Sequence, residues 1–184
     1  MTESDTPLLS SLKSLHAHPT DMRLIFEDLS QVLQGDTSWS RAEIYRAGEI
    51  LLDRKDPATA KGIWQSPPLM MTATLDDAIG QGLKIIHLYS RLAGMNVKQL
   101  GLMQPPDKII EACRLSPPDI LGLTILQFHS EETLCDLVEH LPSQTKVIVG
   151  GPIFTSFSRE ELDTKKYHVL NTIQHFINFL LTLS

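Results

Sequence analysis

The sequence predicts an α/β protein in which a small helical cap precedes a parallel sheet of five strands. The 184 residues contain 42% hydrophobic and 21% charged residues, which is enough apolar material for a sizeable core. Up to the pair Pro67-Pro68, apolar residues recur with helical spacing alone. After this pair, short apolar runs alternate with helical segments, and such alternation favours a doubly wound parallel sheet. We therefore expect a cap domain over residues 1–66 and an α/β domain over residues 67–184.

Three short amphipathic helices are expected in the cap. Leucines at three- and four-residue spacing mark the first over residues 8–15, and a similar pattern marks the second over residues 24–33. The third begins at Ser40, because Ser40 and Glu43 have the spacing of a capping box, and it continues through Leu52. Each helix has one apolar stripe, so the helices must pack on one another or on the domain that follows.

The second part of the chain alternates between strand and helix patterns. Strands are expected over residues 69–75, 96–100, 119–126 and 146–149, with a weaker fifth strand over residues 167–170. Helices are expected over residues 79–93, 106–115, 131–140 and 172–183. In a doubly wound sheet, ligands bind at the carboxyl ends of the strands. The loops that follow the strands are therefore the expected place for functional residues.

Three of these loops contain patterned residues. The first reads Asp-Ala-Ile-Gly-Gln-Gly over residues 77–82, the second Thr-Ile-Leu over residues 124–126, and the third Gly-Gly over residues 150–151. Glycines after a strand let the backbone approach a ligand closely, since they have no Cβ. A threonine hydroxyl at a strand end can hydrogen-bond a buried polar atom of a ligand.

In order and spacing, these loops resemble the cobalamin-binding domains of corrinoid-dependent methyltransferases and mutases. The resemblance covers residues 69–183, and the helical front end resembles the cap of methionine-synthase-like proteins. The family motifs are Asp-x-His-x-x-Gly, Ser-x-Leu and Gly-Gly. The matching residues here are Asp77, Gly82, Thr124, Leu126, Gly150 and Gly151. Ile79 stands where the family has the histidine that ligates cobalt.

The resemblance implies a flavodoxin- or Rossmann-like fold with cobalamin at the strand ends and its nucleotide tail in a slot beside the sheet. Thr124 would hydrogen-bond the base of the tail, and Leu126 would line the slot. In the family, the aspartate orients the cobalt-ligating histidine through its second nitrogen. Because Ile79 cannot coordinate a metal, Asp77 lacks that partner, and no protein ligand to cobalt is expected.

His129 is a further candidate for the cofactor site, because mutase-like relatives have a histidine within about one position of it. There it would face the edge of the corrin or the tail, and the alternative is an exposed residue before a helix. In the cap, four aromatic residues could cover the upper face of cobalt, although core packing explains each of them as well. They are Phe26, Trp39, Tyr45 and Trp64.

Composition argues against several other functions. The formal net charge of −6 and the lack of a Lys/Arg cluster disfavour nucleic-acid binding. The sequence shows neither a signal peptide nor an apolar stretch of the length needed for a membrane span, so we expect a soluble, cytoplasmic protein. Motifs of nucleophilic or nucleotide-dependent catalysis are absent, and a binding or carrier role is favoured over a stand-alone enzyme.

Two functional hypotheses follow. The first is a corrinoid carrier or accessory protein that holds cobalamin without a histidine and serves a partner methyltransferase or radical enzyme. The second is a sensory or regulatory module of the same ancestry whose ligand is haem or has been lost. In that case Phe154, Phe157 and the apolar residues of the last helix, over positions 176–180, would be available to bind a partner protein.

Overall fold

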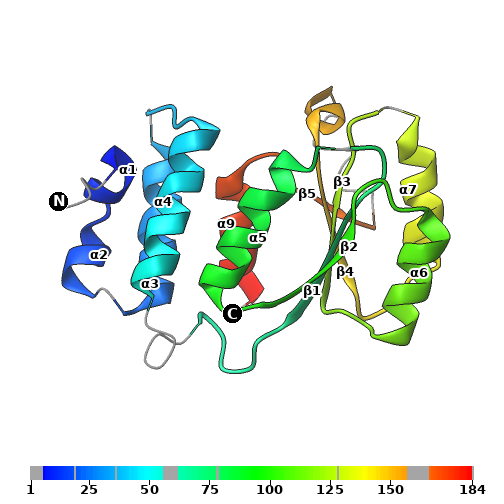
Figure 1. Cartoon of the computed structure of the whole chain (residues 1–184), viewed down its shortest axis with the longest axis horizontal. Helices are drawn as coiled ribbons and strands as arrows, with labels where there is room; N and C mark the ends of the chain where they lie inside the picture. Colours follow the sequence, from blue (N-terminus) through cyan, green and yellow to red (C-terminus); the bar gives the residue numbers. More distant parts are fainter. Residues whose placement is uncertain are drawn as a thin grey trace. The chain divides into compact units, whose positions relative to one another are not determined.

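The computed structural model describes residues 6–18, 20–35, 37–55, 62–77, 79–127, 129–156 and 166–183. Its sheet has five parallel strands in the order β2-β1-β3-β4-β5 (Figure 1). The strands are β1 (Leu69–Thr74), β2 (Asn96–Gly101), β3 (Ile120–Thr124), β4 (Lys146–Gly150) and β5 (His168–Val169). The predicted doubly wound α/β class with five strands is therefore confirmed.

The helices follow the predicted order, except that the single helix expected over residues 8–15 is two short helices and that a 3₁₀ helix, which was not expected, follows β4. They are α1 (Pro7–Ser10), α2 (Lys13–Ala17), α3 (Met22–Gln34), α4 (Arg41–Arg54), α5 (Gln81–Ala93), α6 (Pro106–Leu115), α7 (Ser130–Glu139), the 3₁₀ helix η1 (Pro152–Ser156) and α9 (Ile173–Leu183). The capping box predicted at the start of α4 is present. The amide of Glu43 donates to Ser40 Oγ at 3.2 Å, and the amide of Ser40 donates to Glu43 Oε2 at 2.8 Å.

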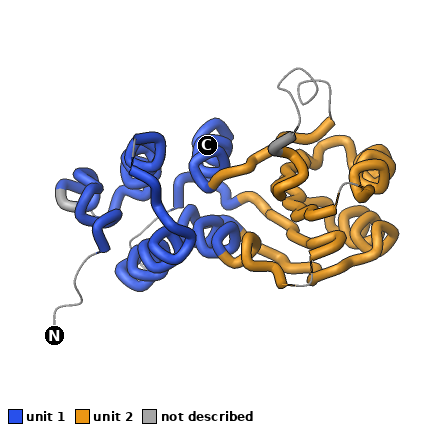
Figure 2. Tube along the Cα trace, turned by 90° about the horizontal axis from the view of Figure 1, so that it is seen from above, with its two compact units in different colours: residues 1–67, 85–95, 173–184 blue, residues 68–84, 96–172 orange. Residues whose placement is uncertain are grey.

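The chain divides into two compact units (Figure 2). The helical unit consists of residues 1–67, 85–95 and 173–184, and the sheet unit consists of residues 68–84 and 96–172. Helix α9 and most of α5 thus belong to the helical unit, although they lie in the second part of the sequence. Each unit is described by itself below.

A buried aromatic pair lies in the core of the helical unit. Phe26 of α3 and Tyr89 of α5 are both fully buried and meet edge to face, with ring centroids 6.4 Å apart. The Tyr89 hydroxyl donates to the backbone oxygen of Ile44 at 2.9 Å, so its polar atom is satisfied within the core. Phe26 is therefore a core residue, which is the second of the two roles considered for it from the sequence.

Helices α3 and α9 pack against each other within this unit. The Ser30 hydroxyl donates to Asn178 Oδ1, and Phe176, Ile177 and Leu180 of α9 are fully buried. In the sheet unit, Phe154 is 1% exposed. The suggestion that these apolar residues form a surface for partner proteins is therefore wrong for Phe154 and for this face of α9, while Phe157 lies outside the described residues.

One face of the sheet packs against α6 and α7 to form the core of the sheet unit. Alternate residues of β1, β3 and β4 point into this core, among them Met71, Leu121 and Val147, and the two helices add Ile109 and Leu134. Burial of each such side chain stabilises the fold by about 1.5–3 kcal/mol. The alternation leaves the intervening residues of the same strands on the opposite face, and some of these are the predicted site residues.

Candidate functional site

The strand order identifies the crevice of the sheet unit. The chain passes from β1 to β2 on one side and then to β3 on the other, so the topological switch lies between β1 and β3. In open parallel sheets, ligands bind outside the carboxyl ends of the strands at this point. The loops of interest are those that follow β1, β2, β3 and β4.

A row of small residues crosses the sheet at these strand ends. Thr74 of β1 pairs with Thr124 of β3, and Thr124 pairs with Gly150 of β4. One row earlier, Thr72 pairs with Gly122 on the same face of the sheet. We call these five residues the small-residue track. A Cβ on Gly122 would lie 2.7 Å from Met70 Cε, a flexible side-chain end that borders the track.

Thr124 and Gly150 are the predicted site residues within this track, and Thr124 is the one with a polar side chain. It is half-buried, and among the described residues its hydroxyl has no hydrogen-bond partner. Thr72 and Thr74 are fully buried. Thr124 therefore offers a ligand one polar side-chain contact at the strand ends, between two glycines that have no side chain.

The first loop ends in a turn that Asp77 stabilises. Asp77 is 6% exposed, and its Oδ1 accepts the amide of Ile79 at 2.8 Å. The Thr74 hydroxyl donates to the backbone oxygen of Asp77, and the amide of Met103 donates to Thr74 Oγ1 at 2.8 Å. The carboxylate of Asp77 thus bonds the backbone of the residue that replaces the histidine.

The glycine that this turn requires is Gly80 rather than Gly82. Gly80 has a φ of 63° directly before α5, and a Cβ on it would lie 2.6 Å from Leu102 Cδ2. Gly82 lies in the first turn of α5, and no described atom lies within 4 Å of the place of its Cβ. Backbone geometry therefore gives no reason for glycine at position 82.

Asp76 joins the first loop to the third, a role that the sequence did not indicate. Its Oδ1 accepts the amide of Leu126 at 2.8 Å, and its Oδ2 accepts the amide of Gln127 at 2.9 Å and the hydroxyl of Ser130 at 2.8 Å. The one signal for it was an acidic residue directly after a strand. The three donors lie 50 to 54 positions further along the chain, and no local pattern connects them to Asp76.

The Gly-Gly pair after β4 has a structural reason. The amide of Ile125 donates to the oxygen of Gly150 at 3.0 Å, which brings the two loops together. Gly151 has a φ of 148°, and a Cβ on it would lie 1.7 Å from the oxygen of Ile125. Only glycine therefore allows this close approach.

Exposed apolar side chains gather in the loops after β1, β2 and β3. Ile79 is 69% exposed, Leu102 42%, Met103 58% and Leu126 40%. We call these four residues the apolar rim. Met103 also has a φ of 50°, which is uncommon for a residue with a side chain and is found most often where function demands it. Exposed apolar residues concentrated at one edge of a sheet indicate a binding surface.

Histidines contribute little to this edge. His129 is exposed and precedes α7 without capping it through its side chain. The first loop, residues 75–82, has no histidine in its sequence. Within the described ranges, no group of three His, Cys, Asp or Glu side chains is arranged to hold a metal ion.

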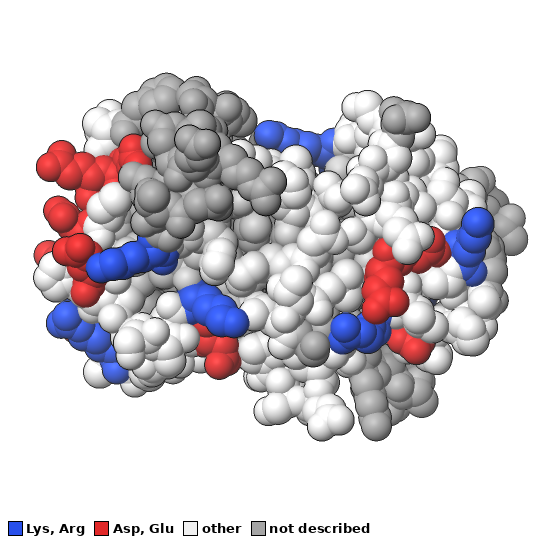
Figure 3. Space-filling view, turned by 180° about the vertical axis from the view of Figure 1, so that it is seen from behind, with Lys and Arg blue, Asp and Glu red and all other residues white. Residues whose placement is uncertain are grey.

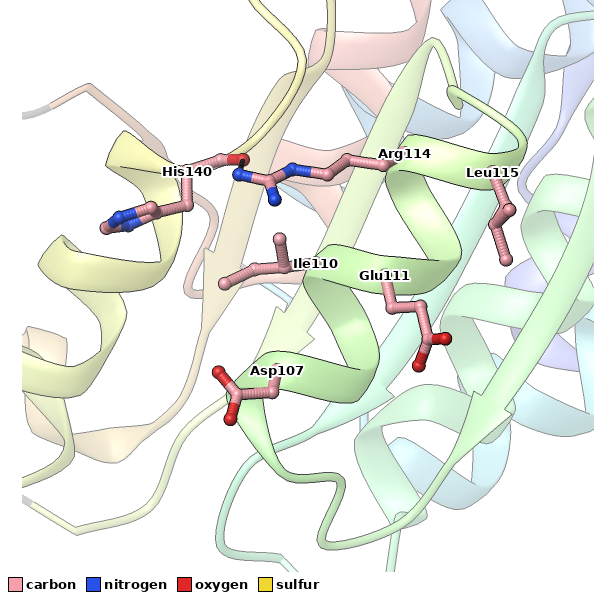
Figure 4. Close-up of a pocket in the computed structure, with 6 residues that line it drawn as sticks. All are labelled: Asp107, Ile110, Glu111, Arg114, Leu115 and His140. Carbon is pink, nitrogen blue, oxygen red and sulfur yellow. Dashed lines mark hydrogen bonds between the residues drawn. The ribbon is translucent and has the colours of Figure 1, made fainter.

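Two further surfaces lie outside the strand-end edge. An open groove of about 440 Å³ lies between α6 and α7, where the Arg114 guanidinium donates to the backbone oxygen of His140 at 3.1 Å (Figure 4). Five of its six lining residues belong to α6, and the sixth, His140, directly follows α7. On the face drawn in Figure 3, the Lys and Arg side chains of the described residues lie singly or beside acidic ones, without a continuous basic stripe.

Comparison with known proteins identifies the family. The B12 binding domain matches residues 69–171, which include the sheet and the loops after β1, β2, β3 and β4. The chain belongs to the B12-binding domain family. The predicted resemblance is thereby confirmed, and cobalamin is supported as the cofactor. Among curated proteins, none matches this sequence.

Solved structures share the fold of this B12-binding protein. A cobalamin-binding protein from Desulfitobacterium hafniense DCB-2 is 16% identical with a TM-score of 0.68, covering 95% of this chain and 90% of the other. The monomethylamine corrinoid protein of Methanosarcina barkeri is 14% identical with a TM-score of 0.53, covering 88% and 68%. The methanol:cobalamin methyltransferase complex of the same organism is 11% identical with a TM-score of 0.59, covering 95% and 67%.

The residues at the strand ends of this B12-binding domain suit a corrinoid. A corrin ring is a large, mainly apolar disc, and the apolar rim offers it an exposed apolar surface. The nucleotide tail is narrow and polar in part, and the small-residue track combines small size with a hydroxyl.

In the described part of the chain, no helix has both the length and the apolar character of a membrane span.

Proposed function

We propose that this chain is a corrinoid carrier or accessory protein that holds cobalamin without a histidine below the cobalt. When bound, cobalamin supplies a cobalt centre that can exchange a methyl group or take part in radical chemistry. The observation that carries the proposal is the first loop of the B12-binding domain, which contains an exposed isoleucine and no histidine.

The proposed lower side of the site is apolar. Ile79 has no atom able to coordinate a metal, and its 69% exposure leaves apolar surface that a ligand would cover. Covering apolar surface is favourable at roughly 25 cal/mol per Å². We expect the apolar rim to contribute affinity by burial, so that the cofactor is held without a metal–protein bond.

The tail of the cofactor would lie along the small-residue track. The Thr124 hydroxyl would donate to or accept from the tail, and Gly122 and Gly150 would have no side chain to obstruct it. Gly82, Leu126 and Gly151 keep their predicted places near the ligand in this proposal, and His129 would face its edge. Asp77 serves the proposed site indirectly, since it stabilises the turn that presents Ile79.

A carrier role is supported by the solved proteins that share this fold. One solved relative is named as a corrinoid protein, and another is a complex with a methyltransferase. A carrier domain brings a bound cofactor to a reaction centre on another protein. The proposed partner is therefore an enzyme that uses the carried corrinoid, either a methyltransferase or a radical enzyme.

The first test is a titration of the purified protein with hydroxocobalamin and with methylcobalamin, followed by gel filtration. We expect corrinoid to co-elute with the protein. After chemical reduction of the bound hydroxocobalamin to cob(II)alamin, electron paramagnetic resonance should show no splitting from a nitrogen below cobalt. A nitrogen splitting in the wild type that is lost in His129→Ala would contradict the proposal, because it would identify His129 as a ligand.

Two variants of one residue test the track. Thr124→Trp should abolish co-elution, because the large indole would occupy the place proposed for the tail. Thr124→Val keeps the branched shape that suits a strand and removes only the hydroxyl, so it should weaken binding about 3- to 10-fold. If neither cobalamin co-elutes with the wild type, the carrier proposal fails, and haem and protein partners become the ligands to test.

A further inference from the structure

The geometry points to Asp76 as the positioning residue of the strand-end site. Its carboxylate joins the loop after β1 to the loop after β3, with both oxygens engaged at 2.8–2.9 Å. This inference rests on the proposed corrinoid site and adds to it the residue that sets the position of one wall. Asp76 itself is not assigned any contact with the ligand.

The arrangement of donors requires a carboxylate. The amide of Leu126 approaches Oδ1, whereas the amide of Gln127 and the Ser130 hydroxyl approach Oδ2. A carboxylate accepts on both oxygens, but the side chain of asparagine has one oxygen and one NH₂ group. In either orientation of asparagine, its NH₂ group would face a backbone N–H, and one loop amide would lose its acceptor.

The bonded segment is the part of the third loop that borders the track. Leu126 belongs to the apolar rim and lies two residues after Thr124, and its backbone has no strand partner beyond the end of β3. The Asp76 bonds therefore replace the missing sheet bonds at this point. Releasing them would let Leu126 move without unfolding β3, whose pairing with β1 and β4 is independent of Asp76.

The same bonds fix the start of α7. Ser130 is the first residue of this helix and is 9% exposed, and its hydroxyl shares Asp76 Oδ2 with the Gln127 amide. The loop is thus held at both ends by one side chain. A ligand that binds against this loop meets a wall already in place, which lowers the ordering cost of binding.

The test compares Asp76→Asn with a matched control at the opposite edge of the sheet. Asp119 Oδ2 accepts the amide of Leu69 at 2.7 Å, and no other side-chain bond to the Asp119 carboxylate occurs among the described residues. Asp119→Asn keeps the one oxygen that this bond needs, so it makes the same chemical change without losing an acceptor. Ser130→Ala removes the hydroxyl bond alone and should have an intermediate effect.

Two quantities are measured on the full chain of each variant. The first is hydrogen exchange of the Leu126 and Gln127 amides without ligand, which we expect to become about tenfold faster in Asp76→Asn. The second is the Kd for hydroxocobalamin, which we expect to rise about tenfold in the same variant. In Asp119→Asn neither quantity should change.

The outcomes separate this inference from the proposed function. Faster exchange together with weaker binding in Asp76→Asn alone supports the inference. Faster exchange with unchanged affinity overturns it, as does unchanged exchange with any affinity. If the wild type binds no hydroxocobalamin, the proposed function fails, and the positioning role fails with it. If the wild type binds and Asp76→Asn has the same Kd, only the positioning role is overturned.

Discussion

Replacing Gly151 by alanine should strongly destabilise the sheet unit. At a φ of 148°, a residue with a Cβ is strained by about 1–3 kcal/mol. The new Cβ would also lie 1.7 Å from the oxygen of Ile125, so the loops after β3 and β4 would have to separate. Separation would break the bond from the Ile125 amide to the Gly150 oxygen, which contributes about 1 kcal/mol. Together these effects predict a loss of roughly 3 kcal/mol or more.

Gly82→Ala is the matched control for this prediction. Gly82 lies in the first turn of α5 without a positive φ, and no described atom would meet its Cβ. Alanine is favoured over glycine in a helix by up to about 1 kcal/mol. The same chemical change is therefore expected to leave stability unchanged or to raise it slightly.

The assay is urea unfolding of the two variants and the wild type, followed by circular dichroism. We expect a much lower midpoint for Gly151→Ala and an equal or higher midpoint for Gly82→Ala. A natural domain is stable by only about 5–15 kcal/mol, so the loss at Gly151 should be easily measured. Equal midpoints for the two alanine variants would refute the argument that the loops after β3 and β4 require glycine at position 151.

Two further predictions concern the helical unit. Tyr89→Phe should lower the free energy of unfolding by about 1 kcal/mol in urea titrations, because the hydroxyl that donates to the Ile44 oxygen is lost from a buried site. Burial lowers the pKa of His87 in the folded protein below its ordinary value of about 6.5. As the pH falls, the unfolded chain therefore takes up a proton at His87 before the folded protein does, and the free energy of unfolding should decrease below about pH 6.5. His87→Gln should reduce this loss between about pH 7 and pH 5.5, and an unchanged pH dependence would exclude His87 as its source.

The elements of the α/β domain were predictable because their signals are local. Helix α6 begins at Pro106 and ends at Leu115, as the sequence predicted, since the pair Pro105-Pro106 marks its start and an apolar stripe runs along it. The expected strands over residues 69–75 and 119–126 are shorter in the structure. They end at Thr74 and Thr124, because their last residues leave the sheet to form the functional loops.

The division of the chain into units depends on contacts that sequence patterns do not record. Helix α9 packs with α3, about 150 residues earlier in the sequence, and the Ser30–Asn178 bond joins the two. Residues 85–95 of α5 likewise belong to the helical unit. Periodicity indicates which face of a helix is apolar, but it does not indicate which other helix covers that face.

Some residues of the candidate site could likewise be predicted from the sequence, and others could not. Thr124 and the Gly-Gly pair could be found from short motifs, because each motif lies within one loop. The need for glycine at position 80 arises from Leu102, and the role of Asp76 arises from residues of the third loop. Such requirements come from the meeting of loops and so could not be inferred from one segment at a time.

The first loop presents the exposed side chain of Ile79 at the position where the resembled motif has a histidine. The Asp77 carboxylate, which in the resembled motif would orient the histidine, is buried and bonded to the amide of Ile79. Its neighbour Asp76 is fully occupied by the third loop. Asp77 Oδ1 thus holds the turn around position 79, and the apolar surface of Ile79 is what this loop presents to a ligand. This exposed apolar side chain is consistent with the proposal that a corrinoid is held by burial and by its tail.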